Sequence, residues 1–291
     1  MCGIYGYFGK IRKGKERKVF HLVCRLALES MVRGKHSTGY YARAYEAEYF
    51  EKEAIPADQF LKKARYLHEA IVDAKAPIFL GHNRHASIGR VNTDNAHPFM
   101  GENLVLIHNG TANEILDIID EDQYSKMEGT TDSEALMWHL EKVGITDFDT
   151  WSNISSFSVF VYDRKNDELY FTHDDKRPLI LWDLRKDLGI VMFASTPKIG
   201  DKALKASGYN KNVSIVVPLR WHLYKADWAE RRFDRINPSF YRDKEEHEHE
   251  VPIYEDDPFY GEGEIQGMAD SEYPYQYRVW NKFTGKFDVY E

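Results

Sequence analysis

The segment MCGIYGYFGK, residues 1–10, decides how the rest of the sequence is interpreted. Its aromatic stretch is typical of a short strand, and one of the chain's 2 cysteines, Cys2, directly precedes that strand. A cysteine thiol with an ordinary pKa of about 8.5 is mostly protonated at neutral pH and needs a base to become a nucleophile. Removal of Met1 would expose an α-amino group, whose pKa of about 7.7–8.0 suits that task. The segment therefore predicts a nucleophile and its base on one residue.

The sequence after this strand alternates short strands with amphipathic helices. Apolar residues at helical spacing predict helices over residues 16–31 and 57–74, and capping residues followed by Gly144 predict a third over 130–144. Strands are predicted over 37–50, 77–85 and 103–110, followed by four short strands between 155 and 195 and another over 213–219. Because strands outnumber helices and follow one another closely, we expect antiparallel sheets packed against helices.

Charge divides the chain into two parts. Residues 221–291 contain 17 acidic and 9 basic residues, whereas residues 1–220 contain 30 of each. We therefore predict a domain over residues 2–220 and an acidic, Tyr-rich C-terminal extension over 221–291, partly flexible, with a possible hairpin at its end. An acidic extension repels phosphate backbones, so direct nucleic-acid binding is not expected.

The cellular compartment is predicted from what the sequence lacks. No apolar run approaches the roughly 20 residues that span a bilayer, and the N-terminus lacks the architecture of a signal peptide. Two cysteines do not make a disulfide framework. These features predict a cytoplasmic protein without a membrane anchor.

Polar clusters at the ends of the predicted strands and in loops carry the functional signal. They are RGKHSTG (33–39), GHNRHASIG (81–89), NAHPF (95–99), IHNGT (107–111) and TTDSE (130–134). Together with MCGI they resemble, over roughly residues 2–200, the class II glutamine amidotransferase domain, an N-terminal-nucleophile hydrolase. They also resemble the glutaminase domain of the aminotransferases that form glucosamine phosphate. The resemblance implies an α+β fold, a four-layer αββα sandwich of antiparallel sheets flanked by helices.

The resemblance also implies a role for each matched residue. Cys2 would attack the side-chain amide of glutamine, and the Asn109 amide and Gly110 N–H would stabilise the oxyanion. At the other end of the substrate, Arg84 would bind the α-carboxylate and Asp132 the α-ammonium. The remaining matched residues are His85, Ala86 and Ser87 in the carboxylate pocket, His97 beside the substrate, and Arg33 as a support for the N-terminal region.

Each of these residues also has a purely structural interpretation. Arg84 and Asp132 could be ordinary structural charges, and His97 could fasten a loop rather than contact substrate. Cys24 fits a small buried hydrophobe. His82 and His85 have an H-x-x-H spacing, but they lie in an amidotransferase motif, so no metal site is expected there.

The motifs depart from the family pattern at several positions. His85 replaces a frequent Trp, His36 replaces a frequent acid, Asn113 comes one position early, and Thr196 replaces a common acid. None of these changes removes the nucleophile, the oxyanion donors or the two charged residues expected to bind the far end of the substrate.

Three functions remain open from the sequence. We expect no cofactor, because no P-loop, G-x-G-x-x-G or ATP-grasp-like stretch is present. The C-terminal extension is too short for a synthase domain, so the first hypothesis is a glutaminase subunit that passes ammonia to a separate synthase. The second is a stand-alone γ-glutamyl amide hydrolase, and the third is a non-catalytic module that senses glutamine. The ammonia acceptor, the partner and the oligomeric state cannot be read from the sequence.

Overall fold

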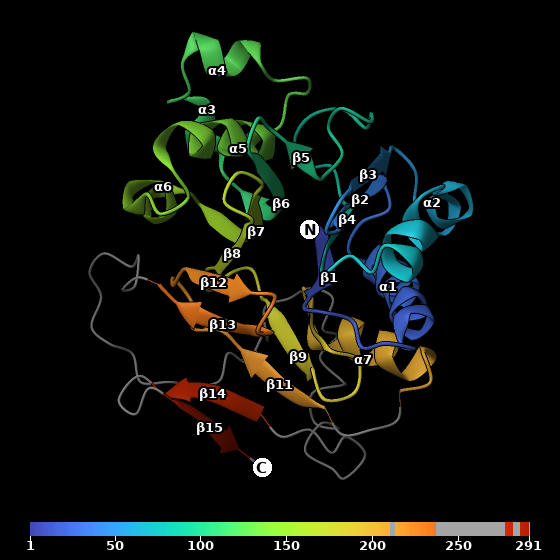
Figure 1. The fold of residues 1–291 in the computed structure, drawn as a ribbon. Coiled ribbons are helices and arrows are strands. Elements are labelled where there is room, and N and C mark those ends of the chain that lie inside the picture. Colours follow the sequence, from blue (N-terminus) through green and yellow to red (C-terminus); the bar gives the residue numbers. More distant parts are fainter. Residues whose placement is uncertain (210–212, 237–276, 282–285, 291) are drawn as a thin grey trace, which may run out of the picture.

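The computed structural model describes residues 1–209, 213–236, 277–281 and 286–290. These residues form two stacked β-sheets with helices on both outer faces (Figure 1). Three apolar cores separate the four layers, one between the sheets and one between each sheet and its helices. This arrangement confirms the predicted α+β sandwich of antiparallel sheets.

The larger sheet places the N-terminal strand at its centre. Its strand order is β15-β14-β11-β9-β10-β1-β4-β2-β3. The strands are β1 (Gly3–Phe8), β2 (Ser37–Arg43), β3 (Glu48–Glu53), β4 (Ile78–Arg84), β9 (Ile180–Leu184), β10 (Ile190–Ala194), β11 (Ser214–Val217), β14 (Tyr277–Asn281) and β15 (Lys286–Tyr290). Neighbouring strands are antiparallel except β11 and β14, which are parallel. Because β1 lies between β10 and β4, the residue before it is held by strands on both sides.

The smaller sheet is antiparallel throughout its described strands, in the order β13-β12-β8-β7-β6-β5. These strands are β5 (Phe99–Met100), β6 (Leu104–Thr111), β7 (Ser156–Asp163), β8 (Glu168–His173), β12 (Tyr224–Asp227) and β13 (Arg232–Arg235). Strands that follow residue 220 therefore pair with both sheets. The division of the chain at residue 220 stays a prediction, and the acidic stretch 243–272 lies outside the described residues.

Helices cover the two outer faces. The larger sheet is covered by α1 (Glu16–Glu29), α2 (Ala57–Lys63), the π-helical turn η2 (Glu69–Asp73) and α7 (Pro197–Ala206). The smaller sheet packs against α3 (Asn113–Leu116), α5 (Asp132–Val143) and α6 (Phe148–Asn153). The short elements α4 (Glu121–Ser125) and η1 (Ser30–Val32) complete the helices of the described residues.

Two elements differ from the sequence-based expectation. The strand predicted over 37–50 is the hairpin of β2 and β3, closed by the Ala44 N–H donating to Ala47 O at 2.8 Å. The helix predicted over 57–74 is broken between α2 and η2. The Glu51 carboxylate accepts hydrogen bonds from the backbone N–H groups of Arg65 and Tyr66, at 2.9 and 3.3 Å, so these groups cannot continue the helix.

The alternation of side chains along β1 explains why this strand can be central. Ile4 and Phe8 point into the core between the sheets, whereas Tyr5 and Tyr7 point into the core under the helices. Both faces of β1 are therefore buried, which contributes about 1.5–3 kcal/mol for each large apolar side chain.

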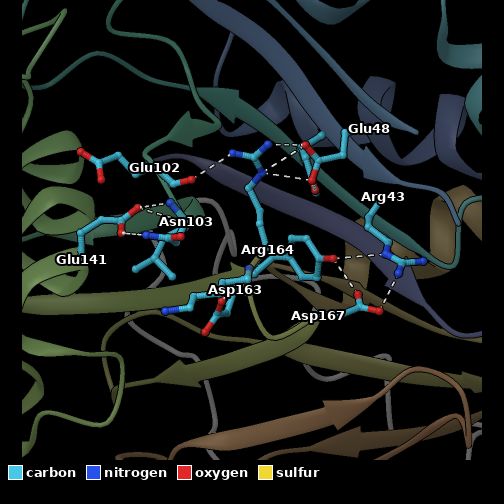
Figure 2. A network of polar contacts seen from close by, with 12 residues as sticks. Arg43, Glu48, Glu102, Asn103, Glu141, Asp163, Arg164 and Asp167 are labelled. Carbon is cyan, nitrogen blue, oxygen red and sulfur yellow. Dashed lines mark hydrogen bonds and ion pairs between the residues drawn. The ribbon is translucent and has the colours of Figure 1, made fainter. Parts of the chain in front are cut away.

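A polar network joins the two sheets at one edge of the sandwich (Figure 2). Arg164, which follows β7, donates from Nε and Nη2 to the Glu48 carboxylate of β3, with an Nη2–Oε2 distance of 2.6 Å. Arg43 of β2 similarly binds Asp167, which precedes β8, at 2.5 Å. These contacts fix the sheets relative to each other, and hence the positions of residues that different sheets contribute to one site.

Candidate active site at the start of strand β1

Cys2 lies immediately before β1, where the N-terminus reaches the sandwich (Figure 1). Gly3 pairs with Asn83 of β4, so the cysteine lies beside the end of that strand. Its Sγ accepts a hydrogen bond from the His85 N–H at 3.4 Å, and its carbonyl accepts one from Arg33 Nε at 2.8 Å. Both contacts hold the predicted nucleophile in one orientation.

The opposite sheet contributes Asn109, from β6. The Cys2 nitrogen donates to Asn109 Oδ1 at 3.2 Å, in a structure that includes Met1. The Asn109 side chain is 1% exposed, and its Nδ2 is buried without a hydrogen-bond partner among the described residues. A buried amide donor without an acceptor is costly. This group is therefore suited to an acceptor that arrives with a substrate.

Gly110 follows Asn109 at a place where no side chain fits. A Cβ there would lie 2.0 Å from Ser156 O and 2.4 Å from His108 Nε2. The glycine therefore allows β6 to continue against β7 with Asn109 in place. Asn109 can therefore keep its position only because the next residue has no side chain.

Arg33 and Gly34 fix the N-terminal segment from the side of η1. Arg33 is 2% exposed and also donates from Nη2 to Met1 Sδ at 3.4 Å. A Cβ on Gly34 would lie 2.4 Å from the Arg84 carbonyl carbon, so only glycine lets the chain pass the end of β4 this closely. The supporting role of Arg33 stays a prediction.

The electrostatics of the thiol favour its protonated form. Burial raises the pKa of the Cys2 thiol, and this effect exceeds the lowering by the His85 N–H and by the positive charges of the Met1 α-amino group, Arg84 and Arg33. The thiol therefore needs a base nearby to become a nucleophile at neutral pH.

Arg84, predicted to bind a carboxylate, supports a loop in this structure. Its Nη1 donates to Arg90 O at 3.0 Å and its Nη2 donates to Ile88 O. Asn95 holds the same loop, donating from Nδ2 to Arg90 O at 3.0 Å and accepting from the Thr130 N–H at 2.7 Å. The loop is thereby tied to the segment before α5, and the carboxylate contact stays a prediction.

Asp132 is the first residue of α5 and is 5% exposed. Its Oδ2 accepts a hydrogen bond from the Ala112 N–H at 2.7 Å, and its Oδ1 accepts one from the Ser133 N–H at 2.9 Å. Burial lowers the pKa of Arg84 and the negative charge of Asp132 opposes this lowering, which places the two groups within electrostatic range of each other. The contact with a substrate ammonium stays a prediction.

The two histidines that depart from the family pattern contact each other. The rings of His36 and His85 stack with centroids 4.9 Å apart, and His36 Nδ1 accepts a hydrogen bond from the Ala86 N–H at 2.8 Å. His85 and Ser87 are exposed. His36 thus helps to shape the segment 85–87 predicted to bind the substrate carboxylate, a contribution that the sequence interpretation recorded only as a departure.

His97 is buried in a group of histidines. Its ring lies 3.9 Å from that of His82 and meets Phe99 edge-on at 4.5 Å, and neither ring nitrogen has a hydrogen-bond partner among the described residues. His82 faces His97 whereas His85 faces His36, so the H-x-x-H pair does not converge on one point. In the described part of the chain, no group of three residues could hold a metal ion.

The sequence interpretation missed several residues that support this site. Ser195, at the end of β10, accepts the Ile4 N–H on Oγ at 2.8 Å and so anchors the start of β1. His108 Nδ1 lies 2.9 Å from Ser133 Oγ, which links β6 to the start of α5. Arg177 Nη1 lies 3.8 Å from Met1 Sδ. His108 and Ser133 belong to the motifs at 107–111 and 130–134, but only the fold shows which groups these residues reach.

The buried histidines predict acid-sensitive stability. Burial lowers the pKa of His82 to about 3, and burial likewise lowers the pKa values of His97 and His108. Below a pH of about 6.5 the unfolded chain gains protons that the folded chain excludes. The free energy of unfolding should therefore fall as the pH drops, by up to about 1.4 kcal/mol per pH unit for each neutral histidine.

Urea denaturation between pH 7.5 and 5 measures this dependence. His97→Phe removes a titrating ring that makes no hydrogen bond in the described structure, so its slope should be shallower by up to about 1.4 kcal/mol per pH unit at the acidic end of this range. His21→Phe changes an exposed histidine and serves as the control. Equal slopes for wild type and His97→Phe would contradict the prediction.

The fold and this site define a class of protein. A four-layer αββα sandwich with a potential nucleophile before the central strand of one sheet is the architecture of the N-terminal-nucleophile hydrolases. The family model described as class II glutamine amidotransferases matches residues 25–153. The predicted resemblance is thereby confirmed over these residues.

Solved structures share the fold. Glutamine phosphoribosylpyrophosphate amidotransferase from B. subtilis, in complex with ADP and GMP, is 16% identical with a TM-score of 0.60, and the match covers 83% of this chain and 50% of that one. The structure of the allosteric regulatory enzyme of purine biosynthesis gives the same values. A glutamine aminotransferase class-II domain protein from Silicibacter pomeroyi is 13% identical with a TM-score of 0.51, and the match covers 83% of this chain and 100% of that one.

The first two solved structures extend beyond the part that this chain matches. The chain spans about half the length of the first two structures, and no curated protein sequence matches it.

In the described residues, no helix has both the length and the apolar composition needed to cross a membrane.

Proposed function

We propose that this chain hydrolyses glutamine to glutamate and ammonia through a thioester on Cys2. The observation that carries this proposal is the buried, unpaired Nδ2 of Asn109, whose Oδ1 binds the Cys2 nitrogen at 3.2 Å. One side chain thus orients the prospective base and presents a donor beside the nucleophile. A donor held in advance at the position of developing charge is what acyl transfer requires.

The proposed reaction begins with removal of Met1. The freed α-amino group takes the thiol proton, and Sγ attacks the amide carbon of glutamine to form a tetrahedral oxyanion. Asn109 Nδ2 and the Gly110 N–H stabilise this oxyanion. The carbon–nitrogen bond then breaks as the α-ammonium returns its proton to the leaving nitrogen, and ammonia departs. Water attacks the thioester by the same route, which releases glutamate and regenerates the thiol.

The far end of glutamine would bind to the polar groups around the loop after β4. We assign the α-carboxylate to Arg84 and the segment His85, Ala86 and Ser87, and the α-ammonium to Asp132. To bind the substrate carboxylate, the Arg84 guanidinium would have to give up some of its hydrogen bonds to the carbonyls of Ile88 and Arg90, or share its donors between both acceptors. Substrate binding should therefore order or shift this loop. His97, buried with no hydrogen bonds among the described residues, would act by packing.

We further propose that the ammonia passes to a separate synthase partner. The solved amidotransferase from B. subtilis is about twice as long as the part that this chain matches, which supports an acceptor activity outside the described domain. A synthase that co-purifies from native lysate and raises glutamine turnover is the expected result. Fast hydrolysis of other γ-glutamyl amides by the isolated chain would instead favour the stand-alone hydrolase.

Removal of Met1 provides the direct test of the mechanism. The intact mass of the purified protein should correspond to a chain that starts at Cys2, and ammonia release should require this form. A preparation that retains Met1 should be inactive, because its Cys2 nitrogen is an amide and cannot accept a proton. Full activity in such a preparation would refute the proposed base.

The Asp132→Asn substitution tests the ammonium contact. Loss of the negative charge should raise the Michaelis constant for glutamine by about tenfold or more, while kcat falls much less. Asn presents only one acceptor oxygen, so either the Ala112 or the Ser133 N–H loses its partner. The free energy of unfolding should be measured alongside the kinetics. An unchanged Michaelis constant in a folded variant would contradict the assignment.

A further inference from the structure

A second polar site lies at the opposite end of β1 from Cys2. Residues 10–13, 15, 186–187 and 231 line an open surface cavity of about 610 Å³. Six of its lining residues are cationic: Lys10, Arg12, Lys13, Lys15, Lys186 and Arg231. Among the described residues that line the cavity, Asp187 is the only acid. Since residues 1–220 are balanced in charge overall, this concentration of cations is local.

Two glycines allow the backbone segments to meet. A Cβ on Gly189 would lie 2.2 Å from Lys10 O, and a Cβ on Gly9 would lie 2.7 Å from Gly189 O. Both glycines have positive φ values, 85° and 124°. The Arg12 N–H donates a hydrogen bond to Leu188 O at 2.9 Å and so joins the two segments. The cations on either side are therefore held near one another by the fold.

Hydrogen bonds connect the three segments into one structure. Arg12 Nε donates to Arg185 O at 3.2 Å, and Arg185 Nη1 donates to Arg231 O at 3.1 Å. Arg231 occupies the left-handed region, with φ of 58°, which is unusual for a residue other than glycine. The turn between β12 and β13 thus fixes this arginine at the cavity.

The cationic groups remain available for a ligand. Among the described residues, none of the six forms an ion pair, and Arg231 Nε is buried without a hydrogen-bond partner. The hydroxyl of Tyr209 donates to Asp187 at 2.5 Å, so this acid is already engaged. Six close cations repel one another unless an anion joins them.

We infer that this cavity binds a compact polyanion, namely a phosphorylated small molecule with a diphosphate or two phosphate groups. Planar guanidinium groups and lysines together suit phosphate oxygens. The described residues of the lining include no aromatic side chain and one apolar residue, Ile11, so they offer a base or other flat apolar group no stacking surface. Recognition is therefore directed at the phosphates.

The start of α1 adds to the positive potential. This helix has 14 residues, and its N-cap, Lys15, lines the cavity and provides no side-chain acceptor for the first backbone N–H groups. Those groups carry the positive end of the helix dipole. The site is distinct from the glutamine site, because β1 has 6 residues, a length of about 20 Å, and separates the two.

Isothermal titration of the full chain with inorganic pyrophosphate, at constant ionic strength, tests this inference. The double variant Lys13→Glu/Lys186→Glu should weaken pyrophosphate binding by at least about tenfold, since each charge reversal replaces an attraction by a repulsion. The matched control is Lys62→Glu/Lys202→Glu, which changes two exposed lysines outside the cavity by the same charge. It should bind pyrophosphate within about twofold of wild type, and both variants should keep glutaminase activity.

Three results would overturn the inference. Pyrophosphate that gives no binding heat with the wild-type chain would exclude the ligand class. Equal loss of affinity in the two double variants would show a non-specific charge effect. A synthetic peptide of residues 243–272, which contain 12 acids and one lysine, could also bind the cavity more tightly than pyrophosphate. That result would make an acidic polypeptide the occupant in place of a phosphorylated molecule.

Discussion

Cys2→Ala should reduce glutamine hydrolysis by at least about 10³-fold, because removal of a covalent nucleophile leaves only binding and oxyanion stabilisation. The side chain contributes little packing, since Cys2 is only half-buried and the hydrogen bonds of its thiol are to the His85 backbone. The variant should therefore fold normally. Its α-amino group remains, so the loss of activity would report on the sulfur alone.

Cys24→Ala is the matched control for this experiment. Cys24, on α1, is also free and half-buried, and it packs against the core under the helices. Burial raises the pKa of its thiol to about 11, which makes it a poor nucleophile at neutral pH. Ammonia release by Cys24→Ala should match wild type. Equal, measurable rates for Cys2→Ala and wild type would exclude the thioester mechanism, whereas no ammonia release by either protein would favour a non-catalytic module.

Much of the sandwich could be predicted because burial leaves a clear pattern along the strands. In β1, alternate residues face different cores, and in β7 the residues Phe157, Val159 and Val161 face one core while Phe160 and Tyr162 face another. Such strands are apolar on both faces and are visible as short runs between turn residues. The layer order came from the family resemblance, since periodicity alone does not pair strands.

Helix α7 shows what the sequence interpretation overlooked. No helix was predicted over residues 197–206, although Thr196 caps the element and Pro197 is its first residue. A capping threonine followed by proline is a recognised start signal. The helix contributes Ile199, Ala203 and Leu204 to the core beside α1.

The residues of the candidate site could be named from the sequence, but the contacts that these residues make could not. The motifs placed Cys2, Asn109 and Asp132 at strand or helix ends, where the structure also places them. The sequence could not show that Arg84 holds the carbonyls of its own loop, or that His36 accepts the Ala86 N–H. These contacts depend on loop conformation, which residue types alone do not determine.

The second large loss of activity is expected on substitution of Asn109. Asn109→Ala removes the only side-chain donor assigned to the oxyanion and also the acceptor for the Cys2 nitrogen. Loss of one oxyanion donor lowers kcat by about 10²–10³-fold in acyl-transfer enzymes. The Michaelis constant for glutamine should change little, because the donor acts on charge that develops only in the transition state. Steady-state ammonia release at several glutamine concentrations separates the two parameters.

Asn109→Asp separates the two functions of this side chain. It retains an acceptor for the Cys2 nitrogen but replaces the Nδ2 donor by a carboxylate oxygen, which would repel the oxyanion. Its kcat should fall at least as far as that of Asn109→Ala, whereas Asn153→Ala, on the surface at the end of α6, should match wild type. If Asn109→Asp kept wild-type kcat while remaining folded, the unpaired donor would have no part in catalysis. Stabilisation of the oxyanion would then have to come from backbone groups alone.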